Sequence, residues 1–148
     1  MSGFEMRPIS AKLSVSPQIT TEDLQAIKDA GFRSIICNRP DGEEADQPTF
    51  ESIRMAAEEL GLETRSIPIT PGQIGDDDVA DFNEALSQMP GLVLAYCRTG
   101  TRSATLWTLA QADTLTVADI LAATRAAGYD MSAVLHRIAD RGKEDLAH

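Results

Sequence analysis

A cysteine and two arginines lie close together in the stretch "LVLAYCRTGTRSATLW" at residues 92–107. Cys97 follows an apolar run typical of a buried strand, and the pattern that follows the loop is helical. Gly100 permits a sharp backbone turn, so successive loop amides can point at one centre, where a helix dipole adds positive potential. Arg102 adds a planar fork of donors. We therefore predict an anion-binding loop beside Cys97, made of Arg98, Thr99, Gly100 and Thr101.

The same loop gives Cys97 a chemical role. Helix N-termini and arginines favour the thiolate form of a cysteine, and the Ser103 hydroxyl can hold that thiolate. Such a thiolate can attack phosphorus or sulfur and carry the transferred group covalently. We therefore take Cys97, Arg102 and Ser103 as the candidate catalytic residues.

Strands and helices alternate along the chain and explain how this loop is positioned. Three apolar strands are separated by helices of about a dozen residues, which is typical of parallel βαβ units. We predict an α/β fold with a central, mostly parallel sheet flanked by helices, in which ligands bind beyond the carboxyl ends of the strands. The predicted strands are 32–38, 63–69 and 92–96, with a short edge strand at 12–15, and the predicted helices are 20–31, 48–60 and 76–89.

Length and composition limit the function classes. The 148 residues suit a single domain, 1–148, with a helical cover from about residue 115 on. The net charge of −10 argues against unspecific binding to nucleic acid or to an anionic membrane. Two cysteines, no cleavable-looking apolar N-terminus and no long apolar run favour a soluble, cytoplasmic protein. Neither histidine is near a cysteine in the sequence, so we expect no metal and no cofactor.

Three blocks of the chain carry a family resemblance. They are "ISAKLSVSPQITTEDLQAIKDAGFRSIICNRPDGEEADQP", "SIPITPGQ" and "AYCRTGTRS", within about residues 5 to 112. They resemble the bacterial phosphatase-like domain of beta-lactamase hydrolase-like proteins, also labelled a sulfurtransferase family, which is related to dual-specificity cysteine phosphatases. The resemblance implies a cysteine-phosphatase-like fold, with Cys97 as nucleophile and Arg102 as anion-binding arginine.

The sequence departs from the phosphatase pattern in ways that bear on the reaction. Four residues separate Cys97 from Arg102 where phosphatases have five, and Tyr96 stands where they have histidine. The general acid of phosphatases is missing after "SIPI". Such an acid typically contributes ~10²–10⁴ in rate, whereas sulfane transfer needs none. We therefore favour a sulfurtransferase carrying a Cys97 persulfide. The alternatives are a phosphatase-like hydrolase acting through a phosphocysteine at Cys97, and a non-catalytic anion or persulfide sensor.

Further residues have two interpretations each. One interpretation of Asp76, Asp77 and Asp78 is that one of them is a displaced general acid. The other is that all three are acids favoured by the dipole at a helix N-terminus. Cys37 is a small buried hydrophobe or a resolving thiol for Cys97. Arg39 and Asp41 border the pocket or belong to a polar loop.

The expected substrate is a small anion or a sulfane-sulfur compound. The resemblance also implies a partner. Relatives of this domain can be joined to metallo-β-lactamase-like enzymes of persulfide metabolism, and we expect any such partner here to be a separate protein. The sequence leaves the oligomeric state open.

Overall fold

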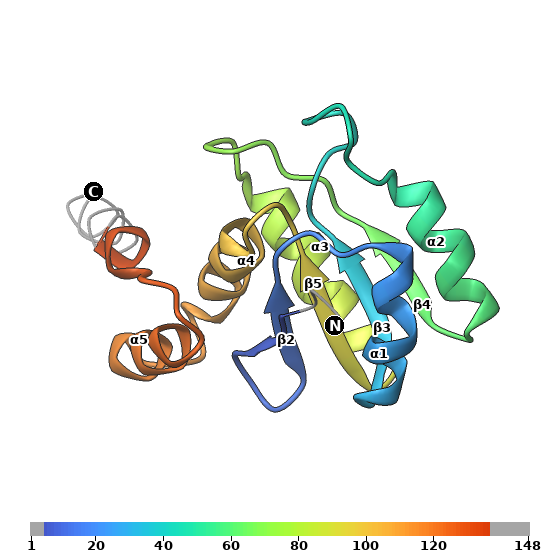
Figure 1. Ribbon diagram of the computed structural model, residues 1–148. Helices are drawn as coiled ribbons and strands as arrows, with labels where there is room; N and C mark the ends of the chain where they lie inside the picture. Colours follow the sequence, from blue (N-terminus) through green and yellow to red (C-terminus); the bar gives the residue numbers. More distant parts are fainter. Residues whose placement is uncertain (1–4, 137–148) are drawn as a thin grey trace.

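Five strands form one sheet in the computed structural model, which describes residues 5–136 (Figure 1). The strand order is β1-β2-β5-β3-β4. The last four run parallel, and β1 pairs antiparallel with β2. The strands are β1 (Arg7–Pro8), β2 (Leu13–Ser16), β3 (Phe32–Cys37), β4 (Glu63–Ser66) and β5 (Leu92–Tyr96). The prediction of an α/β fold with a mostly parallel sheet is confirmed.

The predicted edge strand at 12–15 is not at the edge. It corresponds to β2, which lies between β1 and β5. The outer strand β1 is only two residues long and contains a proline, which cannot donate to a sheet ladder and is tolerated at sheet edges. So short a strand has no periodicity that could be recognised in the sequence.

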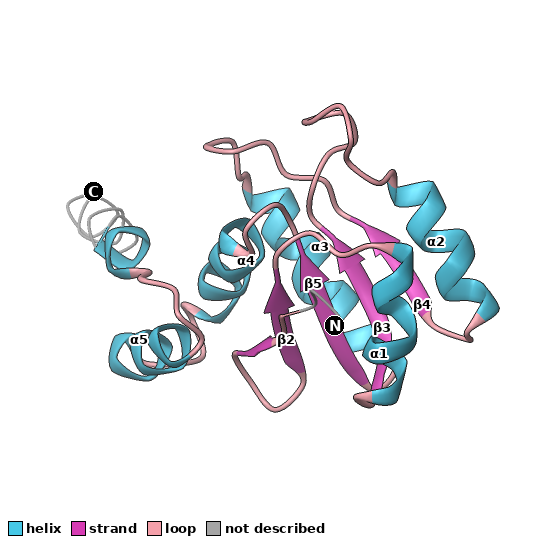
Figure 2. Ribbon diagram, in the orientation of Figure 1, coloured by secondary structure: helices cyan, strands magenta, loops and turns pink. Residues whose placement is uncertain are grey.

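Helices cover both faces of the sheet (Figure 2). They are α1 (Leu24–Asp29), α2 (Phe50–Glu59), α3 (Asp76–Gln88), α4 (Thr101–Gln111) and α5 (Val117–Ala126), with a short 3-10 turn η1 (Thr21–Asp23) before α1. Side-chain caps fix two of the starts. The Thr49 hydroxyl accepts from the Ser52 N–H before α2, and the Thr116 hydroxyl accepts from the Asp119 N–H before α5.

Two apolar clusters fill the spaces between the sheet and these helices. Alternate residues of a strand point to opposite faces, so Leu94 and Tyr96 pack with residues of α1 and α2, while Val93 and Ala95 pack with residues of α3, α4 and α5. With both faces covered, the carboxyl ends of the parallel strands are where a ligand can approach.

The C-terminal part of the described chain packs on the α3 and α4 side. Its buried apolar residues belong to the same cluster as α3 and α4; they are Ile120, Ala127, Tyr129, Met131 and Leu135. Residues 132–136 are again helical, and the rest of the predicted helical cover lies outside the described residues. Across residues 5–136 no helix combines the length and the apolar character needed to span a membrane.

Candidate active site

Cys97 stands directly after β5, at the carboxyl end of the sheet, and is fully buried. The next residues curl around its sulfur. The Gly100 N–H donates to Cys97 Sγ at 3.1 Å, and Gly100 has a φ of +94°, in the left-handed region that favours glycine. Helix α4 then begins at Thr101, so its N-terminal N–H groups lie in the same loop. This is the loop-to-helix geometry that the sequence predicted around Cys97.

Tyr129 contacts this loop from the segment that follows α5. Its hydroxyl donates to the Thr99 carbonyl at 3.0 Å, and a Cβ at Gly100 would overlap that hydroxyl. Arg7 in turn lies over the Tyr129 ring, 5.6 Å from its centroid, and donates to the Ala127 carbonyl at 3.2 Å. We call this arrangement of Arg7 and Tyr129 the clasp. Sequence reasoning missed Tyr129, because nothing local in the sequence pairs it with a loop 30 residues earlier.

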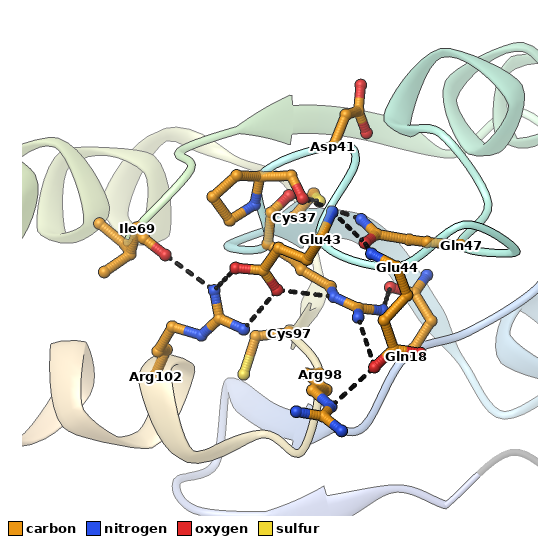
Figure 3. Close-up of polar contacts among 12 residues, drawn as sticks. Gln18, Cys37, Asp41, Glu43, Glu44, Gln47, Ile69, Cys97, Arg98 and Arg102 are labelled. Atoms are coloured by element: carbon orange, nitrogen blue, oxygen red, sulfur yellow. Dashed lines mark hydrogen bonds and ion pairs between the residues drawn. The ribbon is translucent and has the colours of Figure 1, made fainter. Parts of the chain in front are cut away.

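Arg102 is fixed beside Cys97 by three hydrogen bonds. Nη1 and Nη2 donate to the two carboxylate oxygens of Glu43 at 2.8 Å each, and Nη1 also donates to the Ile69 carbonyl at 2.8 Å (Figure 3). The Glu43 hydrogen bond raises the pKa of Arg102, and Cys97 adds to that shift. The guanidinium is therefore a permanent cation with a set orientation, 12% exposed at the loop.

Glu43 links Arg102 to a second arginine. Arg39 Nε donates to a Glu43 oxygen at 2.9 Å, and its Nη1 donates to Gln18 at 3.0 Å. Hydrogen bonds from Arg102 first, and then from Arg39, lower the pKa of Glu43 to about 2. Arg39 itself is 4% exposed. The structure thus ties Arg39 to Arg102 through Glu43, and a role for Arg39 at the border of the pocket stays a prediction. It also adds Glu43, which sequence reasoning missed although the residue lies in the same polar loop.

Arg98 lies at the mouth of the site. Its side chain is 66% exposed and forms an ion pair with Glu44 at 2.9 Å. Glu44 also forms an ion pair with Arg39 at 3.2 Å. The loop after β3 is therefore tied to the cysteine loop at two places, through Glu43 and through Glu44.

The Ser103 hydroxyl has a partner other than Cys97. Ser103 is fully buried, and its Oγ donates to the Asn38 side-chain oxygen at 2.8 Å. The Asn38 side-chain amide in turn donates to the Ile67 carbonyl at 2.9 Å. The hydroxyl hydrogen is thereby directed at Asn38, where it fixes the start of α4 against the end of β3.

Cys37 lies on the opposite face of the sheet from α4. It is opposite Tyr96 in the β3–β5 register and belongs to the α1 and α2 cluster. Burial raises the pKa of this thiol, which keeps it protonated at neutral pH. Both cysteines are free. A resolving role for Cys37 stays a prediction.

The predicted acids lie at helix starts. Asp41 is exposed and accepts from the Phe50 N–H at the beginning of α2. Asp76, Asp77 and Asp78 form the first turn of α3, where Asp78 accepts from the Gly75 N–H at 2.9 Å. Asp76 and Asp77 are exposed. A general-acid role for one of the three stays a prediction.

A groove of about 610 Å³ opens next to Arg102. It runs between the loop that follows Ile69, the exposed side of α4 and the segment after α5. Its lining residues are Pro71, Gly72, Ile74, Thr101, Arg102, Thr105, Leu109, Asp130, Met131 and Val134. Within residues 5–136, no three His, Cys, Asp or Glu side chains gather as a metal site would require.

The chain was compared with known proteins. Residues 5–114 match the family model described as beta-lactamase hydrolase-like protein, phosphatase-like domain. The beta-lactamase hydrolase-like proteins of Xylella fastidiosa and Agrobacterium fabrum are each 35% identical, over 103 and 104 residues respectively. Each match covers 70% of this chain and 24% of the relative, so the chain corresponds to about a quarter of their length.

Solved structures agree on the fold. A candidate phosphatase from Neisseria meningitidis is 36% identical, with a TM-score of 0.83 over 90% of this chain and 96% of the other. A kinase-associated phosphatase whose catalytic-site cysteine is replaced by serine has a TM-score of 0.73 at 15% identity, over 99% of this chain and 96% of the other. The cysteine-phosphatase-like fold implied by the resemblance is confirmed.

Proposed function

We propose a phosphatase-type hydrolase acting through Cys97, because the chain belongs to the phosphatase-like domain family of beta-lactamase hydrolase-like proteins. The observation that carries the proposal is the Gly100 N–H directed at Cys97 Sγ, with the Arg102 fork beside it. A donor at the sulfur and a fixed cation next to it are what a nucleophilic thiolate and its anionic substrate require. The comparisons support this hypothesis better than the sulfur transfer that the loop length favoured.

The proposed reaction has two steps. Cys97 Sγ attacks the phosphorus of a phosphomonoester, so that an S–P bond forms and the ester P–O bond breaks. Water then attacks the phosphocysteine, which releases inorganic phosphate and restores the thiolate. Arg102 and the N–H groups at the start of α4 would stabilise the charge on the phosphoryl oxygens in both steps.

The proton supply restricts the leaving group. Glu43, with a pKa of about 2, is ionised at neutral pH. Hydrogen bonds from Ser132 lower the pKa of Asp130, the carboxylate in the groove, so this group is ionised as well. Asp78 caps α3. With Glu43 and Asp130 ionised, the favoured substrates are esters whose alcohol leaves readily as an anion, such as aryl phosphates.

The test is the hydrolysis of an aryl phosphate by the reduced protein and by Cys97→Ser. We expect turnover by the wild type, inhibition by vanadate, and no turnover by the variant. The serine variant should unfold at a similar temperature, because it keeps the side-chain shape. Persistent hydrolysis in Cys97→Ser would contradict the proposal.

Sulfur transfer is the second candidate. It is favoured by the four-residue spacing between Cys97 and Arg102 and by the ionised carboxylates, since a sulfane donor needs no general acid. Intact mass spectrometry after incubation with thiosulfate separates the two functions. A gain of one sulfur atom that disappears in Cys97→Ser, together with no aryl phosphate turnover, would support the transferase. Binding of an anion without either reaction would support the sensor.

A further inference from the structure

We propose that the groove beside Arg102 binds the organic part of the substrate, and that this part is an uncharged, apolar aryl group. The inference rests on the proposed function and names the substrate class for it. The groove reaches the start of α4, directly after the cysteine loop, because Thr101 and Arg102 are among its lining residues. The groove would therefore lie next to the ester oxygen of a phosphoryl group held by Arg102.

The walls of the groove are mainly apolar and come from three segments. The loop before α3 contributes Ile74, α4 contributes Leu109, and the segment after α5 contributes Met131 and Val134. On α4 the groove residues Thr101, Thr105 and Leu109 are four apart, so they form one stripe along the helix. Apart from Met131, these apolar walls are only half-buried in the protein alone, so a ligand can still remove area from water.

The size of the groove suits an organic ligand. Pockets for small organic molecules occupy ~300–1,000 Å³, and this one is about 610 Å³. An inorganic phosphate would fill only a small part of that volume. A polypeptide is a poor match, because the apolar walls offer few partners for backbone N–H and C=O groups. A compact aryl body matches both the volume and the lining.

Charge in the groove disfavours a second anionic group on the ligand. Arg102 is the only cation among its lining residues, and its Nη1 and Nη2 already donate to the Glu43 carboxylate. Asp130 is the other charged lining residue, and it is ionised. The protein also carries a net charge of −10. A single phosphate on an uncharged body is therefore preferred over polyanions such as nucleotides.

The test compares two substrates and two matched variants. The substrates are 2-naphthyl phosphate and acetyl phosphate, which differ in apolar area; because their leaving groups also differ in pKa, each variant is compared with the wild type through the ratio of the two kcat/KM values. The variants are Leu109→Gln in the groove and Leu115→Gln as the control, since Leu115 is 39% exposed and does not line the groove. Val134→Gln provides a second groove variant from a different segment. Binding of 2-naphthylphosphonate, measured by calorimetry, reports the groove without any turnover.

We expect both groove variants to lower the ratio of kcat/KM for naphthyl phosphate over acetyl phosphate about tenfold, mainly through KM, because a lost apolar contact in such a pocket changes selectivity by ~10–200-fold. Leu115→Gln should keep the wild-type ratio. The phosphonate should bind about tenfold more weakly to both groove variants.

An unchanged ratio in both groove variants, or an equal fall in Leu115→Gln, would overturn the inference. So would a marked preference of the wild type for a phosphotyrosine peptide over naphthyl phosphate. If neither substrate is hydrolysed but the phosphonate binds and both groove variants weaken it, the proposed function fails and the groove inference stands.

Discussion

Replacing Gly100 by alanine should lower the free energy of unfolding by about 4 kcal/mol and greatly reduce turnover. The φ of +94° at this position costs an L-residue ~1–2 kcal/mol. The new Cβ would also overlap the Tyr129 hydroxyl and approach its ring carbon at 2.9 Å. Tyr129 must then move, which breaks its hydrogen bond to Thr99, worth ~1 kcal/mol, and strains packed neighbours by ~1–3 kcal/mol.

The structural origin of this cost can be isolated with Tyr129→Phe. This change removes the hydroxyl that the alanine would meet and gives up the hydrogen bond to Thr99 in advance. In that background Gly100→Ala should cost only about 2 kcal/mol, which is mainly the backbone term. The difference of about 2 kcal/mol is the coupling energy of a double-mutant cycle. Urea unfolding of the four proteins measures it, and aryl phosphate turnover is followed in parallel.

Equal costs of Gly100→Ala in the two backgrounds would show that Tyr129 does not crowd the loop, against this prediction. A loss of turnover in Gly100→Ala without a loss of stability would refute it in another way. In that case the alanine would change the conformation of the loop without contacting Tyr129.

Four further predictions concern the charges and the proton supply of the site. Glu43→Gln should lower kcat/KM for aryl phosphates about tenfold, since the charged partner of Arg102 is lost. The control Glu44→Gln should lower it less, because Glu44 contacts Arg39 and Arg98 instead of Arg102. Because the pKa of Glu43 is lowered to about 2, its contribution to stability is complete above about pH 4.5 and is lost as the pH falls toward 2. The free energies of unfolding of wild type and Glu43→Gln, measured with urea, should therefore converge over that pH range. Asp78→Ala should lower stability by about 1 kcal/mol through the lost cap of α3 and leave turnover intact, and a fall in kcat would instead identify it as the general acid. Finally, the rates of substituted phenyl phosphates should fall steeply as the pKa of the released phenol rises, and a flat dependence would reveal a proton donor.

The sequence was sufficient for the elements that depend on local pattern. The β-branched run of β3 and the apolar run of β5 identified the central strands, and the alternation with helices identified a parallel sheet. Cys97, Gly100 and Arg102 were recognisable because they lie close together in one short stretch of sequence, and a stretch of that composition has few other uses. The strand β1 was missed because two residues carry no pattern.

The residues that complete the site were missed for a different reason. Glu43 meets Arg102 across 59 positions of sequence, and Tyr129 meets Thr99 across 30. Such pairs depend on how whole helices and strands pack, and no local sequence pattern indicates them. For Ser103 the sequence offered Cys97 as a partner, but the hydroxyl faces Asn38 at the end of a neighbouring strand. The sequence pattern therefore located the cysteine, the turn glycine and the arginine, but not the residues that hold them in place, and the comparisons support the phosphatase alternative better than the sulfur transfer it favoured.

The clasp has a consequence for the order in which parts of the protein reach their final structure during synthesis. Every strand of the sheet, and Cys97 itself, leaves the ribosome before Tyr129 does. At translation rates of ~5–20 residues per second, Tyr129 is added about 2–6 s after Cys97. Once residue 97 has emerged from the ribosome, all the strands can pair, although the Tyr129 hydroxyl that donates to the Thr99 carbonyl has not yet emerged. The sheet can therefore be assembled while the cysteine loop still lacks the hydrogen bond from Tyr129, so the loop reaches its final conformation only after the segment that follows α5 has packed.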